Sequence, residues 1–179
     1  NDANLMGRGE TMYGAGNGAT HVVFLTVGTG IGGAVIIDGK LFNGYANRGT
    51  ELGHVPLIAN GEPCACGSIG CLEHYASTAP MTKATHVFQL FHSLMSFDTN
   101  LLELPVYRTM VLKPLCIAGF INIFSPQRVV IGGGLSEAGD FYIQKVSEKA
   151  LRYAIPDCAV NTEIMAASLG NKAGSIGAA

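Results

Sequence analysis

Residues 21–43 read HVVFLTVGTGIGGAVIIDGKLFN, and this stretch decides the fold class. It divides into a strand, a glycine turn, a strand, a hairpin turn and a strand, at residues 21–27, 28–33, 34–37, 38–39 and 40–43. The first piece is apolar and rich in β-branched side chains, which is typical of a buried strand. Asp-Gly is a favoured two-residue hairpin turn. The order predicts an antiparallel meander and not a Rossmann βαβ unit.

The flanking sequence predicts helices together with two further strands. Helices are expected at residues 3–16, 72–79, 115–124 and 137–153 and from residue 173, with strands at 128–131 and 159–165. Asp2 is expected to cap the first helix and Ser136 the helix at 137–153. Pro105 and Pro114 are expected to act as breakers in the less readable segment 80–115. These elements predict an α/β fold with a mixed sheet flanked by helices.

The composition places the chain among ordinary globular proteins. Of its 179 residues, 48% are hydrophobic and 13% are charged, and the net charge is −2. This apolar content is enough to bury a core and excludes a disordered chain. The absence of a basic run disfavours nucleic acid as a partner of this segment. The sequence has no apolar run of eighteen residues and no signal peptide. We therefore expect a cytoplasmic location and neither membrane association nor secretion.

Four potential metal ligands lie within eighteen residues. They are His54, Cys64, Cys66 and Cys71. One imidazole and three thiolates are a ligand set that closes a tetrahedral zinc site, and glycines beside them allow sharp turns. Glu51 precedes the histidine by three residues and Glu73 follows the last cysteine by two. A metal here would hold rigid a loop, residues 51–73, that presents two acids.

Other roles for these cysteines stay open from spacing alone. They could be disulfide or redox partners, or buried thiols with no special role. The Cys-x-Cys spacing is too tight for a comfortable bridge within the pair. Cys116 and Cys158 stand alone in apolar surroundings and are expected to be small core residues.

Three glycine turns each follow a predicted strand, at residues 28–33, 132–134 and 170–174. Backbone amides exposed at such turns form cradles for phosphate oxygens, and Thr29 adds a hydroxyl. A single glycine turn is more often just a turn. Three of them beside an acid-lined loop favour a nucleotide site.

The chain resembles the ROK family of bacterial sugar kinases and sugar-responsive repressors, most closely its glucokinase-like members. The matching stretches are residues 1–4 (NDAN), 22–44, 49–57 (GTELGHVPL), 64–77 (CACGSIGCLEHYAS), 121–140 and 169–179 (LGNKAGSIGAA). They cover somewhat less than half of the chain and follow the family's order. The resemblance implies the actin-like ATPase (ribonuclease H-like) fold. Residues 1–179 would be the C-terminal lobe, with the N-terminal lobe missing.

Carried over by position, the resemblance implies a role for each matching residue. Asp2 would be the catalytic base; Asn1, Asp2, Glu51, His54 and Glu73 would bind the sugar; Gly28, Thr29 and Gly30 would form a phosphate turn; and Gly132, Gly133 and Gly134 would belong to the nucleotide site. His54 would place one ring nitrogen on a structural zinc and turn the other toward the sugar.

The implied activity is ATP-dependent phosphorylation of a hexose, with Mg²⁺ on the nucleotide. The alternative is a sugar-sensing transcriptional repressor that binds the sugar without phosphorylating it. A homodimer is expected. The 179 residues alone, without the other lobe, are expected to be inactive.

Overall fold

The computed structural model describes residues 1–77, 105–134 and 139–178. One five-stranded sheet has the order β3-β2-β1-β4-β5. Its strands are β1 (Val22–Val27), β2 (Ile31–Ile37), β3 (Lys40–Phe42), β4 (Arg128–Gly132) and β5 (Glu163–Ala166). β1, β2 and β3 pair antiparallel, whereas β4 lies parallel to both β1 and β5. The predicted meander and the mixed sheet are therefore confirmed.

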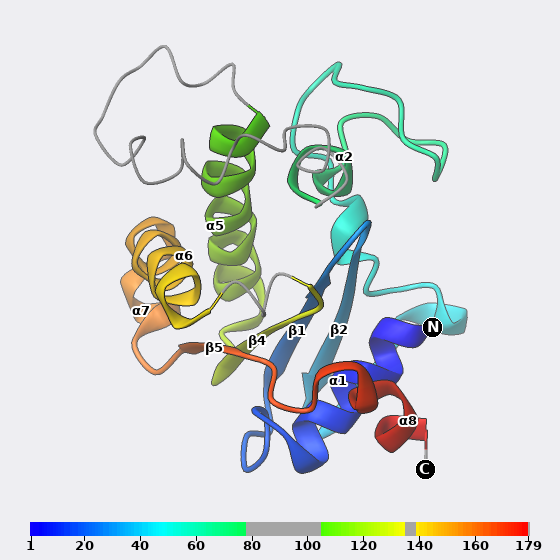
Figure 1. The fold of residues 1–179 in the computed structure, drawn as a ribbon, viewed down its shortest axis with the longest axis vertical. Helices are drawn as coiled ribbons and strands as arrows, with labels where there is room; N and C mark the ends of the chain where they lie inside the picture. Colours follow the sequence, from blue (N-terminus) through cyan, green and yellow to red (C-terminus); the bar gives the residue numbers. More distant parts are fainter. Residues whose placement is uncertain (78–104, 135–138, 179) are drawn as a thin grey trace.

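Helices cover both faces of this sheet (Figure 1). They are α1 (Asp2–Tyr13), α2 (Leu72–Ala76), α5 (Pro105–Phe124), α6 (Asp140–Tyr153), α7 (Pro156–Ala159) and α8 (Ala173–Ala178), with short 3-10 turns η1 (Tyr45–Asn47), η2 (Leu52–His54) and η5 (Gly170–Lys172). The helices α1 and α8 pack together on one face. The helices α5 and α6 pack together on the other, and α2 packs against α5.

The central strand β1 explains the layering, because both of its faces are apolar. Val22 and Phe24 belong to a small core on the α1 side. Val23 and Leu25 point the other way, into a larger core that includes Ile121 of α5. Successive side chains of a strand alternate between faces, so a continuous apolar run predicts helices on both sides.

Three predictions about helix ends and breakers are wrong. Asn1, and not Asp2, caps α1, because its side-chain oxygen accepts a hydrogen bond from the Ala3 amide. The helix also ends at Tyr13, before the glycines that follow. Pro114 does not end a helix but lies inside α5, which runs on to Phe124. Proline removes one backbone donor there, and the apolar packing of α5 outweighs that loss.

The remaining boundaries differ more modestly. α2 is three residues shorter than expected, and α6 begins at Asp140 behind Gly139 and not at residue 137. The final strand begins at Glu163 and not at residue 159, because Ala159 ends the short helix α7, which begins at Pro156. α8 begins at Ala173 as predicted. Ser136 and the segment 80–104 lie outside the described residues.

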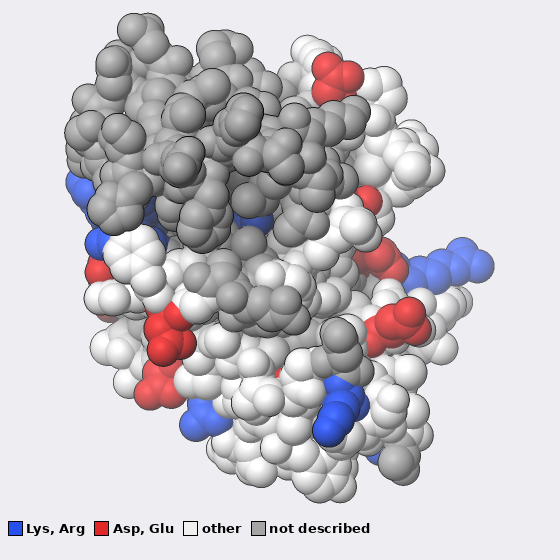
Figure 2. Space-filling view, viewed as in Figure 1, with Lys and Arg blue, Asp and Glu red and all other residues white. Residues whose placement is uncertain are grey.

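Charged side chains are sparse on the face seen in Figure 2, where uncharged residues cover most of the described surface. Acidic groups lie along its right-hand rim, on the side where Figure 1 places the N-terminus, and also at its lower left. In the part of the chain that the structure describes, no helix combines the length and apolarity needed to cross a bilayer.

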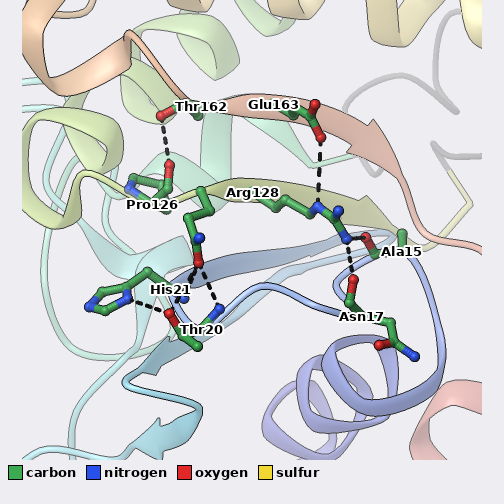
Figure 3. A network of polar contacts seen from close by, with 9 residues as sticks. Ala15, Asn17, Thr20, His21, Pro126, Arg128, Thr162 and Glu163 are labelled. Carbon is green, nitrogen blue, oxygen red and sulfur yellow. Dashed lines mark hydrogen bonds and ion pairs between the residues drawn. The ribbon is translucent and has the colours of Figure 1, made fainter.

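A polar network fixes the amino ends of the parallel strands (Figure 3). The Gln127 side-chain oxygen accepts hydrogen bonds from the backbone amides of Thr20 and His21, at 2.7 and 3.1 Å. The Arg128 guanidinium donates to the carbonyls of Ala15 and Asn17 at 2.9 and 2.6 Å. The same guanidinium lies 3.6 Å from the Glu163 carboxylate on β5. These contacts tie the α1–β1 loop to β4 and β5 and set their register.

Candidate active site and metal centre

The four predicted metal ligands converge in the structure. The candidate ligand atoms of His54, Cys64, Cys66 and Cys71 all lie within 4.8 Å of one another. The Cys64 sulfur is 3.6 Å from His54 Nδ1, and the Cys66 sulfur is 3.7 Å from the Cys71 sulfur. All five cysteines of the chain are free, and no disulfide joins them in this structure.

The separations of 3.6 and 3.7 Å in these two pairs fit a zinc ion. Bonds of about 2.3 Å to sulfur and about 2.0 Å to nitrogen, at tetrahedral angles, place two sulfurs about 3.8 Å apart and a sulfur and a nitrogen about 3.6 Å apart. The structure therefore supplies a complete Cys3His set. Nδ1 is the ring nitrogen of His54 that faces the cluster, which leaves Nε2 on the other side of the ring.

The backbone around the cluster folds on glycines. Gly67 and Gly70 adopt φ values of 91° and 69°, which other residues rarely adopt. Gly70 also lies so close to the Ile58 carbonyl oxygen that a Cβ would overlap it. An isolated bridge between Pro56 and Cys71 brings the two halves of the loop together. The sulfur ligands thus converge because the intervening backbone can reverse sharply.

The thiols of Cys66 and Cys71 lie in environments that shift their pKa values in opposite directions. A hydrogen bond from the Ser68 backbone lowers the pKa of the exposed Cys66 thiol. Burial raises the pKa of Cys71, which is 0% exposed, to about 11. A buried thiol stays protonated in an apolar site unless a cation takes the place of its proton. This chemistry agrees with a structural metal.

The N-terminus of α1 lies against the metal loop. The Asn1 side-chain amide donates to Glu51 Oε1 at 3.4 Å, although fifty residues separate the two in the sequence. The Glu51 carbonyl accepts from the His54 amide at 3.0 Å within η2. Asn1, Asp2 and Glu51 are all exposed, and a ligand could reach them.

Glu73 occupies a different place from Glu51, beside the first glycine turn. Its Oε2 accepts a hydrogen bond from the Ile31 amide at 2.8 Å. Gly30 borders the same oxygen, because a Cβ there would lie 2.6 Å from it. The acid after the last cysteine is thus joined to the turn at residues 28–30, which the spacing of the sequence alone did not indicate.

The three glycine turns meet at one edge of the sheet. β1, β4 and β5 are parallel and adjacent, so the turns that follow them lie at their shared carboxyl ends. Gly133, with φ 82°, packs directly against the backbone of Val27. Ligands of open α/β sheets bind outside the carboxyl ends of the strands. The position of the turns fits a nucleotide site, as the sequence predicts.

Glu10, which was not identified from the sequence, stabilises the chain beside the third glycine turn. Glu10 of α1 is completely buried, and its carboxylate accepts hydrogen bonds from the amides of Ala15, Ser168 and Leu169 at 2.8, 3.1 and 2.7 Å. It fixes the chain just before the third glycine turn. A lone glutamate in a glycine-rich helix carries no sequence signal for such a role.

Comparison with known proteins agrees with this geometry. The model of the ROK family matches residues 1–179. The chain belongs to the ROK family. It is 36% identical to a glucokinase of Thermotoga maritima over 200 residues, covering 100% of this chain and 63% of the relative. It thus spans less than two thirds of that relative's length.

Other members of the ROK family match along the chain. The crystal structure of a ROK glucokinase from Streptomyces griseus, in complex with glucose and AMPPNP, superposes with a TM-score of 0.81 at 28% identity, covering 100% of this chain and 65% of that one. A xylose repressor of Bacillus subtilis is 26% identical, over 99% of this chain and 48% of the repressor. This chain has the actin-like ATPase fold of the ROK sugar kinases, with a mixed sheet flanked by helices.

Proposed function

We propose that the protein is an ATP-dependent, glucokinase-like hexose kinase and that residues 1–179 are its C-terminal lobe. The observation that carries this proposal is the hydrogen bond between Asn1 and Glu51. It places the start of α1, where Asp2 stands, beside the acid-bearing metal loop. The similarity to glucokinases supports the same activity.

Asp2 is the base in this proposal. As a sugar hydroxyl attacks the γ-phosphorus of ATP, the carboxylate takes the hydroxyl proton, and the bond from phosphorus to the β,γ-bridging oxygen breaks to release ADP. Asn1, Glu51, His54 and Glu73 hold the sugar through its hydroxyls. A site built to bind hydroxyls in this way rejects analogues that lack one.

The glycine turns position the nucleotide. The turn at Gly28, Thr29 and Gly30 cradles phosphate oxygens through the amides of Thr29 and Gly30 and the Thr29 hydroxyl, since the Gly28 amide closes the turn on the Gly30 carbonyl. Gly132–Gly134 form another part of the nucleotide site. Bound Mg²⁺ would neutralise charge on the phosphates. Zinc has a structural role, because four protein ligands would fill its coordination sphere and leave no position for a reacting water.

The proposed kinase function also implies a second lobe and an oligomeric state. Turnover requires the second lobe of the family fold, so residues 1–179 alone bind ligands weakly and do not turn over. Homodimerisation and a cytoplasmic location complete the proposal, and thiolate ligands for a structural zinc suit a reducing compartment.

Asp2→Asn tests the assignment of the base in the full-length protein. It keeps the size of the side chain and removes the proton acceptor, so kcat falls by about 10²–10⁴-fold. The glucose Kd, measured by calorimetry, changes by less than about threefold, since the amide still hydrogen-bonds. A coupled ADP-release assay over a panel of hexoses gives kcat. Turnover by the variant at the wild-type rate would remove Asp2 from its role.

The second candidate is a sugar-sensing repressor of the same family. The match to the xylose repressor favours it. The same hexose panel separates the two, because a repressor binds a sugar without releasing ADP. Sugar-dependent DNA binding by the full-length protein, together with no turnover, would establish the repressor instead.

A further inference from the structure

The metal loop holds Ile31 from two sides. The sequence places this residue within the glycine turn at 28–33, but in the structure the turn ends at Gly30 and Ile31 begins β2. Ile31, the first residue of β2, donates its amide to Glu73 Oε2 at 2.8 Å. Its carbonyl lies so close to Gly53 that a Cβ at position 53 would overlap the oxygen. Gly53 directly precedes the ligand His54, and Glu73 follows the ligand Cys71 by two residues. Both flanks of the four-ligand cluster therefore contact the backbone of one residue, Ile31, on its amide and on its carbonyl.

Side-chain packing adds to these two backbone contacts with Ile31. Leu52 is buried, and its side chain fills the space that a Cβ on Gly33 would occupy. The turn itself is closed by a hydrogen bond of 2.9 Å from the Gly28 amide to the Gly30 carbonyl. A shift of the metal loop would therefore displace the backbone that begins β2.

Glu73 has one carboxylate oxygen left for a ligand. Within the described residues its hydrogen bond uses Oε2, and the side chain is half-buried, so Oε1 remains available. The space beside Oε2 exists because residue 30 is glycine. A charged acceptor on a backbone amide makes a strong hydrogen bond. A sugar hydroxyl bound to Oε1 would hold the carboxylate still, and the carboxylate would hold the turn.

We infer that Glu73 is a positioning residue for the phosphate turn as well as a sugar ligand, so that it couples hexose binding to nucleotide binding. The inference rests on the proposed kinase function. Because such coupling is reciprocal, each ligand tightens the other by the same factor, about fivefold or more. A sugar ligand with no role in the turn would produce no such effect through Ile31.

Hydrogen exchange of the Ile31 amide tests the contact without any ligand. In the full-length protein, Glu73→Ala is expected to speed this exchange by about tenfold or more, because the acceptor is gone. Glu73→Gln keeps an oxygen and retains most of the protection. The amide of Val35, within the β1–β2 pairing, is the internal control and keeps its protection. Unchanged exchange at Ile31 would overturn the inference.

Gly30→Ala tests the contact between Glu73 and the Ile31 amide without removing the carboxylate. The new Cβ displaces Oε2 from Ile31 while Glu73 stays present, and residue 30 has a backbone conformation that alanine adopts. Exchange at Ile31 is expected to rise as in Glu73→Ala. In the double variant the Gly30→Ala change adds little, because the two act on one contact. Simple additivity would contradict the inference, as would protection retained in Gly30→Ala.

Nucleotide affinity with and without glucose completes the test. The wild type is expected to bind AMPPNP more tightly with glucose, and Glu73→Ala and Gly30→Ala lose this gain and bind AMPPNP more weakly without sugar. If the wild type binds AMPPNP and Glu73→Ala binds it equally well without glucose, Glu73 is a sugar ligand alone and the inference fails. If the wild type binds no nucleotide, the proposed function itself fails.

Discussion

Buried charged residues are the least expected feature at the scale of single residues. Glu10 is 0% exposed, yet three backbone amides satisfy its carboxylate. Lys113 of α5 is 5% exposed, and its Nζ has no hydrogen-bond acceptor among the described residues. The first links α1 to the β5–α8 connection, and the second lies in an apolar layer. Their energetic effects should therefore have opposite signs.

Glu10→Ala is expected to destabilise the protein by about 3 kcal/mol or more, because three buried amides would lose their acceptor. Chemical denaturation of the variant measures the loss. Glu10→Gln is the matched control, since its amide oxygen replaces part of the acceptor, and it should lose less. Equal stability of Glu10→Ala and the wild type would show that water replaces the carboxylate.

Lys113→Met is expected to stabilise the protein, and by an amount that depends on pH. Burial lowers the pKa of Lys113 from 10.5 to about 7. Between these values the unfolded chain binds one proton more than the folded protein, so wild-type stability rises with pH through that window. The gain from methionine, about 2 kcal/mol, is therefore largest below pH 7 and fades toward pH 10.5.

Denaturation of both proteins across this pH range gives the difference. Tyr142 is the polar neighbour, with Lys113 Nζ 6.0 Å from its ring centre, and burial raises the pKa of its hydroxyl. The tyrosine therefore stays neutral through the window. A difference that does not vary with pH would contradict the titration of Lys113.

At the scale of elements, close packing of α1 and α8 rests on glycine. Gly9 of α1 touches the Ala173 carbonyl, and Gly177 of α8 lies against the Leu5 carbonyl, with no room for a Cβ at either position. α1 carries Asp2 at its start and α8 follows the third glycine turn. This contact therefore sets the distance between two parts of the proposed site.

Gly177→Val is expected to destabilise the protein by about 1–3 kcal/mol, because the added atoms overlap the backbone of α1. Gly174→Ala, in the same helix, is the matched control. Its Cβ would meet Met6 at an ordinary 3.6 Å, and alanine favours a helix by up to about 1 kcal/mol. Thermal unfolding compares the two. A Gly177→Val variant as stable as Gly174→Ala would refute the close contact.

Local sequence signals predicted some elements of the structure, and contacts between distant segments decided others. The apolar run of β1 and the Asp-Gly turn predicted the meander, because strand and hairpin signals are local. The Cys3His set was recognisable because a metal needs specific ligand types. The length of α5 through Pro114 and the burial of Glu10 were missed, since both depend on contacts between distant segments. The hydrogen bond from Ile31 to Glu73 was missed for the same reason.

At the scale of the whole molecule, one loop connects the parts of the proposed site. Residues 51–73 contact Asn1 through Glu51 and the first glycine turn through Glu73, and the Cys3His cluster lies between these two acids. The loop has little regular secondary structure apart from η2 and the start of α2. The proposed zinc would therefore fix the shape of the loop and, through it, the proposed hexose site.

The glucose affinity of Cys66→Ser, measured by calorimetry in the full-length protein with its zinc content recorded, tests this claim most directly. Removing one ligand should release the metal and weaken glucose binding by about tenfold or more. Cys158→Ser, which changes a free cysteine outside the cluster, should keep one zinc per chain and wild-type affinity. Wild-type glucose affinity in a zinc-free Cys66→Ser protein would contradict a pocket shaped by the metal.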